Sequence, residues 1–156
     1  MFSRSERSVK SRDPGLGFKS ILVPVDGSEA SIHAVEFACT LAKRSRGKVH
    51  VVHVIEVRRA LALDAELTAE AQSGEEVLSR AEAAAKRQDF EVAGDLLQAR
   101  DASHAIVDEA VEREADAIIL GVPFNRPFGE FEMGRVPTHI LKSATCEVIV
   151  LRLPSE

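Results

Sequence analysis

The chain has 156 residues, of which 45% are hydrophobic and 29% charged, so it is long enough for one well-buried core and too short for two ordinary domains. Its formal net charge of −5 and its aromatic content of 4% argue against a nucleic-acid-binding surface. Its apolar runs fall short of the roughly 20 residues that cross a bilayer, and the polar N-terminus lacks the apolar core of a signal peptide, so we expect a cytoplasmic protein with no membrane span.

The first 17 residues predict a flexible N-terminal tail, followed by one domain over residues 18–154. The tail is rich in Ser, Arg and Gly and has almost no apolar side chains, so burial cannot offset the entropy lost on ordering it. Beyond it, short apolar runs alternate with segments in which apolar residues recur at helical spacing. The runs predict strands at 19–25, 48–57, 91–99, 116–121 and 147–152. The helical segments are 28–45, 66–88, a helix capped by Asp101 or Ser103, and 136–143.

Strands that alternate with helices predict right-handed crossovers and a parallel sheet covered on both faces. The expected fold class is therefore α/β, with a doubly wound five-stranded sheet. Ligands of such sheets bind outside the carboxyl ends of the strands, where the strand order reverses. Asp26 and Gly121 both occupy such positions, although Asp26 is equally suited to the turn that precedes Gly27 and a helix cap at Ser28.

The remaining reactive side chains predict structural roles. Cys39 and Cys146 lack the spacing of a metal site or a CxxC motif, so we expect both in the core. His50 and His53 lie three residues apart in a strand and therefore point to opposite faces, where they cannot share an ion. Because the sequence offers no nucleophile with a base, no Walker lysine and no metal cluster, we predict neither an enzyme nor a bound metal.

The segment GVPFNRPFGEFEMGR, residues 121–135, joins an apolar strand to a short helix. Gly121, Gly129 and Gly134 would let the backbone approach a ligand, and the N-terminus of the helix after Gly134 favours an anion. A cation such as Arg135 in the first turn of a helix is mildly disfavoured unless an anion lies nearby. That anion is either a bound phosphate or the loop's own Glu130 and Glu132, and the sequence leaves both open.

Four segments together resemble the universal stress protein family. They are the opening ILVPVDGSEAS, the strand ending HVI at residues 53–55, the run ADAIILG at 115–121, and the ending ILKSATCEVIVLR. The resemblance implies the adenine nucleotide alpha hydrolase-like fold with strand order 3-2-1-4-5. It places Asp26 and Gly121 on either side of one crevice.

The nucleotide-binding branch of that family carries Gly-x2-Gly-x9-Gly-Ser/Thr, and this chain keeps half of it. Gly121 and Gly134 match the pattern, whereas Phe124 and Arg135 replace a glycine and a hydroxyl residue. The resemblance implies that Asp26 binds ribose hydroxyls and that the backbone of Val54 meets the adenine edge. The nucleotide-binding positions that it implies are Pro24, Asp26, Val54, Gly121, Gly129, Gly134, Arg135 and Val136. The two replacements disfavour the usual pose of ATP. The expected ligand is therefore AMP or a cyclic nucleotide.

The family also implies a homodimer formed through the last strand, Val148 to Leu151. The expected function is thus a regulatory, stress-response module that binds an adenine nucleotide. The alternative is an interaction or scaffold domain that has lost the ligand, with Phe124, Phe128 and Phe131 as its contact patch. The loop GVPFNRPFGEF is similar to that of universal-stress-type domains attached to amino-acid and cation transporters, which suggests a membrane transporter as a partner.

Overall fold

The computed structural model describes residues 17–155, so the predicted tail lies outside the described part except for Gly17. The strands are β1 (Ser20–Pro24), β2 (Lys48–Glu56), β3 (Ala93–Ala99), β4 (Ala117–Val122) and β5 (Glu147–Arg152). The helices are α2 (Glu29–Ser45), α3 (Thr68–Arg87), α4 (Ala102–Glu112) and α5 (Arg135–Ser143). Every element that the sequence predicts is present, and the observed ends differ from the predicted ones by two residues at most.

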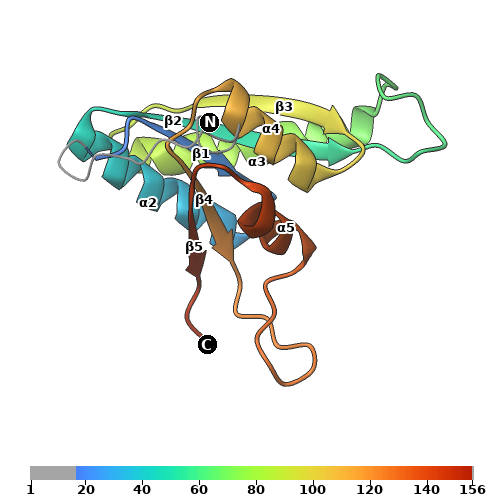
Figure 1. The fold of residues 1–156 in the computed structure, drawn as a ribbon. Helices are drawn as coiled ribbons and strands as arrows, with labels where there is room; N and C mark the ends of the chain where they lie inside the picture. The colour runs from blue at the N-terminus through green and yellow to red at the C-terminus, as the bar shows by residue number, and fades with distance from the viewer. Residues whose placement is uncertain (1–16, 156) are drawn as a thin grey trace, which may run out of the picture.

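The five strands form one parallel sheet in the order β3-β2-β1-β4-β5, which confirms the predicted topology. β1 lies at the centre and pairs with β2 on one side and β4 on the other (Figure 1). The chain therefore reverses its direction of winding between β1 and β4. That reversal creates the switch point at which sheets of this class bind ligands.

Helices cover both faces of the sheet, which explains why the strands are continuous apolar runs (Figure 1). Successive side chains of a strand point to opposite faces. In β1, Ile21 and Val23 belong to the core beneath α2 and α3, whereas Leu22 belongs to the core beneath α4 and α5. Both faces of the sheet are thus buried by apolar side chains.

Side-chain caps fix where two of the helices begin. The Ser28 hydroxyl accepts a hydrogen bond from the Ser31 N–H at 3.2 Å, as predicted for an N-cap of α2. At α4 the structure selects Asp101 over Ser103: the Asp101 carboxylate accepts from the His104 N–H at 3.1 Å and from the Ser103 hydroxyl. These hydrogen bonds hold the pKa of Asp101 at about 2, with that from Ser103 the largest contribution.

The two cysteines lie in or beside the core. Cys39 is fully buried, and burial together with the nearby Glu36 charge raises its pKa to about 11. Cys146 is partly buried against the core beneath α4 and α5, and burial raises its pKa as well. Both thiols are therefore poor nucleophiles at neutral pH. Across residues 17–155 the structure contains no helix with the length and apolar character needed to cross a membrane.

Candidate functional site

A cleft opens at the carboxyl edge of the sheet, where β1 and β4 diverge. Its walls are the ends of β1, β2 and β4, the first turns of α4 and α5, and one residue of α2. It is lined by Pro24, Val25, Asp26, Ser31, Val52, His53, Val54, Ala102, Ile106, Leu120, Gly121, Val136 and Pro137. Its volume of about 150 Å³ is comparable to that of a cavity that holds a benzene ring. The cleft therefore has room for one flat ring system, while any group attached to the ring would lie in its open mouth.

Five of the eight predicted site residues line this one cleft: Pro24, Asp26, Val54, Gly121 and Val136. They come from β1, β2, β4 and α5, which the sheet order brings together. As predicted, Asp26 and Gly121 flank the same crevice.

Asp26 is poised to accept hydrogen bonds as a carboxylate. Its Oδ1 accepts from the Ser28 N–H at 2.9 Å, and its own N–H donates to the Ser31 hydroxyl at 3.3 Å. Partial burial acts to raise the pKa of Asp26, but the hydrogen bonds from Ser28 and Ser31 outweigh it and keep the pKa below its usual range. The side chain is therefore ionised at neutral pH and suited to hydroxyl donors of a ligand.

The backbone of Val54 faces the space beyond the carboxyl end of β1. The ladder between β1 and β2 ends with the Val25 N–H donating to the Val52 carbonyl at 2.8 Å. Alternate residues of a parallel strand direct their backbone groups to the same side, so the N–H and C=O of Val54 point past the end of β1. One donor and one acceptor side by side match the hydrogen-bonding edge of a nucleobase.

Gly121 serves a purpose other than the one expected from the sequence. A Cβ at this position would lie 1.8 Å from the carbonyl oxygen of Ala30 and 3.0 Å from the Ser31 nitrogen, both in the first turn of α2. The backbone of α2 therefore makes the close approach to Gly121 that we expected a ligand to make. Packing of α2 on β4 thus requires this glycine, whatever the cleft binds.

Gly129, Gly134 and Arg135 do not line the cleft. Gly129 and Gly134 have positive φ angles of 85° and 92°, and a Cβ on either would meet nothing within 4 Å. Gly134 is the N-cap of α5, and Arg135 borders a separate shallow hollow on the outer face of that helix. Since Pro137, at the third position of α5, has no N–H, the start of this helix also offers one donor fewer to an anion than usual.

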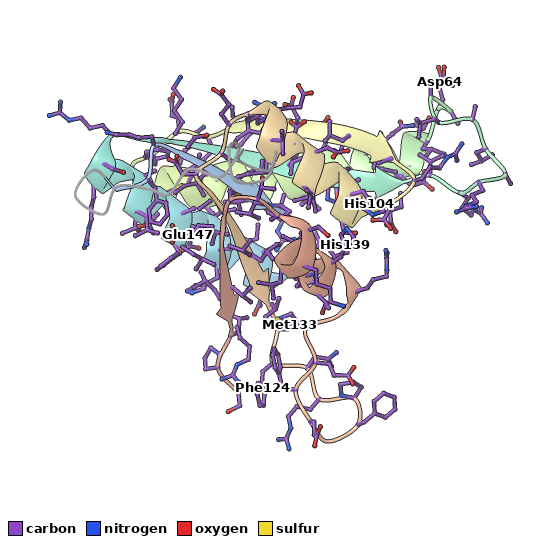
Figure 2. All side chains as sticks on the ribbon, in the orientation of Figure 1. Asp64, His104, Phe124, Met133, His139 and Glu147 are labelled. Carbon is purple, nitrogen blue, oxygen red and sulfur yellow. The ribbon has the colours of Figure 1, made fainter. Side chains whose placement is uncertain are left out.

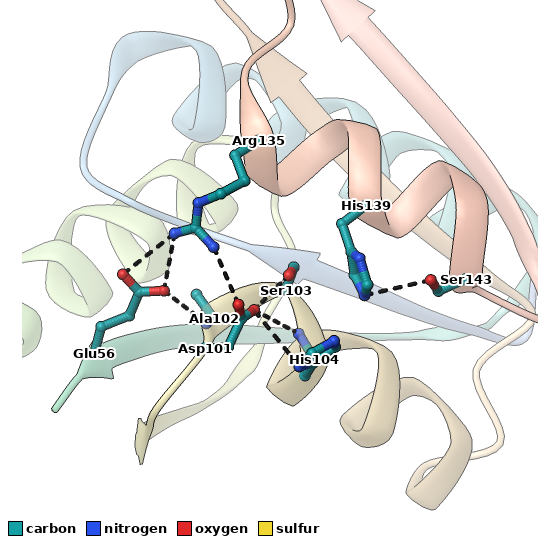
Figure 3. A network of polar contacts seen from close by, with 8 residues as sticks. All are labelled: Glu56, Asp101, Ala102, Ser103, His104, Arg135, His139 and Ser143. Carbon is teal, nitrogen blue, oxygen red and sulfur yellow. Dashed lines mark hydrogen bonds and ion pairs between the residues drawn. The ribbon is translucent and has the colours of Figure 1, made fainter. Parts of the chain in front are cut away.

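Neither explanation that the sequence offered for Arg135 describes its contacts in the structure. Its Nη2 lies 3.2 Å from Glu56 Oε2 and its Nη1 lies 3.1 Å from Asp101 Oδ2 (Figure 3). These partners belong to β2 and to the cap of α4, whereas one of the two alternatives that the sequence left open had placed Glu130 and Glu132 beside the cation. The two acids also occupy the donors that a bound phosphate would use.

The ring of Phe124 turns away from the cleft. It stacks on Phe131 with ring centroids 6.0 Å apart and lies 4.5 Å from the Arg152 guanidinium at the end of β5. Phe124 thus lies within the loop that projects from the carboxyl edge of the sheet, near the start of that loop (Figure 2). Phe128, at the tip of the same loop, is 85% exposed. The loop's aromatic rings do not fill the space where a flat ligand would sit.

Sequence comparison identifies the class of this fold and cleft, because residues 17–152 match the model of the universal stress protein family. The chain belongs to that family. A universal stress protein of Methanocaldococcus jannaschii is 27% identical over 145 residues, which cover 89% of this chain and 85% of that protein.

Solved universal stress proteins share this architecture. One from Archaeoglobus fulgidus superposes with a TM-score of 0.74 at 26% identity, covering 85% of this chain and 97% of the other. The structure of an Archaeoglobus fulgidus universal stress protein in complex with dAMP has a TM-score of 0.69 at 24% identity, covering 85% and 96% of the two chains. Residues 115–121 and 140–152, which carried the resemblance in the sequence, contain most of β4 and all of β5 within this shared fold.

A histidine cluster in this universal stress protein lies outside the cleft. His50 Nε2 is 2.9 Å from Asp95 Oδ2, and the Arg113 guanidinium bridges Asp95 and Glu109 at 2.6 and 2.7 Å. Although His50, Asp95 and Glu109 lie close enough together to hold an ion, the guanidinium already contacts Oδ2 of Asp95 and Oε2 of Glu109. Burial and then the Arg113 charge lower the pKa of His50. The arrangement is an ion-pair network.

Sequence reasoning missed several residues that shape the cleft and its mouth. Ala102 and Ile106 line it from α4, and the side chain of His53 closes its floor by hydrogen bonding to the Val25 carbonyl at 2.7 Å. Glu56 lies two residues beyond Val54 in β2 and thus on the same face of the sheet. That two-residue spacing is the signal in the sequence that would have placed Glu56 near the mouth.

Proposed function

We propose that this universal stress protein is a regulatory module that binds an adenine nucleotide with few phosphates, AMP or a cyclic form in preference to ATP, without chemical conversion. The observation that carries the proposal is the pairing, in one cleft, of the ionised Asp26 carboxylate with the unpaired backbone edge of Val54. The first suits ribose hydroxyls and the second suits a purine edge. The complex of a related fold with dAMP supports the same class of ligand.

The volume of the cleft supports a preference for AMP or a cyclic nucleotide over ATP. The cleft holds about one ring system, and the glycines that would cradle a phosphate chain lie outside it. The base would therefore be bound inside the cleft, with the ribose beside Asp26 at its open mouth and the phosphate beyond the ribose. A cytoplasmic location and a role in stress response remain predictions from the sequence.

Replacing Asp26 tests this proposal directly. Calorimetry with adenosine, AMP, cyclic AMP and ATP should detect binding of AMP by the wild type and affinity about tenfold or more lower in Asp26→Ala, because hydrogen bonds to a charged acceptor are worth about 1.5–3 kcal/mol. Asp26→Asn should give an intermediate loss, since its side-chain oxygen still accepts from the Ser28 N–H.

The matched control is Asp64→Ala, which removes an exposed acid on the loop at the far end of the molecule (Figure 2). It should leave the affinity for AMP unchanged. If no adenine compound binds the wild type, the proposed function is wrong. If AMP binds equally well to Asp26→Ala, the ligand lies elsewhere.

The proposal includes a homodimer formed through β5, and the sheet supplies the support for it. β5 is an edge strand, and an exposed edge of unpaired backbone groups pairs readily with another strand. Glu147 and Leu153 donate their N–H groups to the neighbouring chain segments at Asp116 and Val122, so Val148 and Val150 direct theirs outward.

Val150→Pro should shift the protein from dimer to monomer, because proline removes an outward N–H without removing a hydrogen bond to β4. Sedimentation equilibrium would measure the shift. Val150→Thr retains the N–H and a β-branched side chain, so it should remain dimeric. A dimer of unchanged strength in Val150→Pro that retains its native circular dichroism would place the interface on another surface.

A second candidate function, an interaction or scaffold domain without a ligand, is favoured by the exposure of Phe128 at the tip of the 123–134 loop. A transporter is the partner that the loop's sequence suggests. This candidate is preferred if calorimetry detects no heat with any adenine compound while the protein remains folded.

A further inference from the structure

A three-residue ion bridge crosses the mouth of the cleft. The Arg135 guanidinium, at the start of α5, contacts Glu56 at the end of β2 and Asp101 before α4 (Figure 3). The hydrogen bonds and charges of Glu56, followed by the charge of Asp101, raise the pKa of Arg135. Arg135 is thus held in its charged form by the two acids.

Both carboxylates of the bridge are also held by backbone groups. Glu56 Oε2 accepts from the Ala102 N–H at 2.9 Å, and Asp101 Oδ1 accepts from the His104 N–H at 3.1 Å. Each acid is therefore fixed in place independently of the cation. If Arg135 swings away, the two negative charges remain at the mouth.

The bridge lies directly against the cleft. Ala102 and Val136, which line the cleft, are the immediate neighbours of Asp101 and Arg135 in sequence, and Glu56 is on the face of β2 that carries Val54. Asp26 also lines the cleft, so the cleft and the bridge together hold three carboxylates and one guanidinium. The bridge itself, with two acids and one cation, carries a net charge of −1.

We infer that Glu56 and Asp101 determine specificity by making the cleft reject polyphosphates and accept adenine compounds of low negative charge. The inference rests on the proposed function, because it concerns the same cleft. Exposed ion pairs are individually weak, so the discrimination arises from the summed charge and grows with each phosphate on the ligand. Arg135 is the counterion of the two acids, which occupy the donors it would offer to a phosphate.

The test is the double variant Glu56→Gln/Asp101→Asn. Both amides keep the oxygen that accepts from Ala102 or His104, and asparagine is as good an N-cap as aspartate. Calorimetry with AMP and ATP, at low ionic strength in EDTA, gives the ratio of their dissociation constants. We expect the wild type to prefer AMP, and the double variant to lose about tenfold of that preference by gaining affinity for ATP. The gain should shrink at high salt.

The matched control is Glu36→Gln/Asp95→Asn, which removes two acids that pair with Arg87 and Arg113 away from the cleft. It changes the net charge equally and should leave the ratio unchanged. A double variant with an unchanged ratio overturns the inference and leaves the proposed function standing, whereas a wild type that binds ATP as tightly as AMP overturns the inference together with the proposed preference for AMP.

Two other outcomes are also decisive. If only the double variant binds ATP and the wild type binds no adenine compound, the proposed function is wrong, and with it the inference that the cleft accepts adenine compounds of low negative charge. If neither protein binds any of these compounds, both the inference and the proposed function are wrong. Should the double variant fail to fold, Glu56→Gln alone is expected to move the ratio in the same direction by about threefold.

Discussion

Gly121→Ala is expected to destabilise the folded protein by about 3 kcal/mol or more, although it adds a single methyl group. The new Cβ would lie 1.8 Å from the Ala30 carbonyl oxygen and 2.4 Å from its carbonyl carbon. A flexible side chain can move out of the way of such a contact, but these atoms belong to the backbone of a buried helical turn. Overpacking costs about 1–3 kcal/mol where side chains can adjust, so a clash with backbone should reach or exceed the upper end. Equilibrium unfolding in urea would measure the loss.

The other loop glycines provide the matched controls. Gly129→Ala and Gly134→Ala place a methyl group where nothing lies within 4 Å, so only their positive φ angles oppose the change. An L residue at a positive φ such as that of Gly129 costs about 1–2 kcal/mol. At Gly134 the φ of 92° and ψ of 174° lie in a region almost restricted to glycine, where the cost is about 1–3 kcal/mol. If Gly121→Ala is no more destabilising than these two variants, the packing of α2 on β4 does not explain the glycine. A large difference would show that a glycine shared with a nucleotide-binding signature here serves the fold.

The fold was predictable because its determinants are local in the sequence. A strand buried on both faces must be apolar at every position, and a helix covering it must be apolar on one stripe. The runs in β1, β2 and β4 and the stripe of α2 satisfy both conditions, and caps such as Ser28 mark where the chain changes from one to the other. The alternation of strands and helices does not specify the order of the strands in the sheet. That order was predicted from the family resemblance.

The contacts of the site were less predictable, because they join residues far apart in sequence. Arg135 is 79 residues from Glu56 and 34 from Asp101, so the balance of charge within its own loop pointed to the wrong acids. The direction of the Phe124 ring likewise depends on Arg152, which β5 brings alongside after a further 28 residues. Asp26 follows the end of a central strand, so the sheet places it at the carboxyl edge, whereas the position of Val54 was expected from the family resemblance.

Ile140→Ala is expected to cost about 3 kcal/mol and to release α5 from the sheet. Of the nine residues of this helix, Ile140 alone is fully buried, and it packs into the core with Leu22 and Ile118. Truncating a buried isoleucine to alanine costs about 2–5 kcal/mol, and no second fully buried side chain of α5 is available to hold the helix in place.

Release of α5 should be visible beyond the loss of stability. Once released, the amides of α5 should exchange hydrogen faster than those of α2. Because α5 contributes Val136 and Pro137 to the cleft, the affinity for AMP should fall as well. Leu141→Ala is the control within the same helix: its side chain is 45% exposed, so we expect stability within about 0.5 kcal/mol of the wild type. Slow exchange of the α5 amides in Ile140→Ala would mean that contacts of partly buried residues suffice to hold the helix. The cleft wall would then not depend on this single anchor.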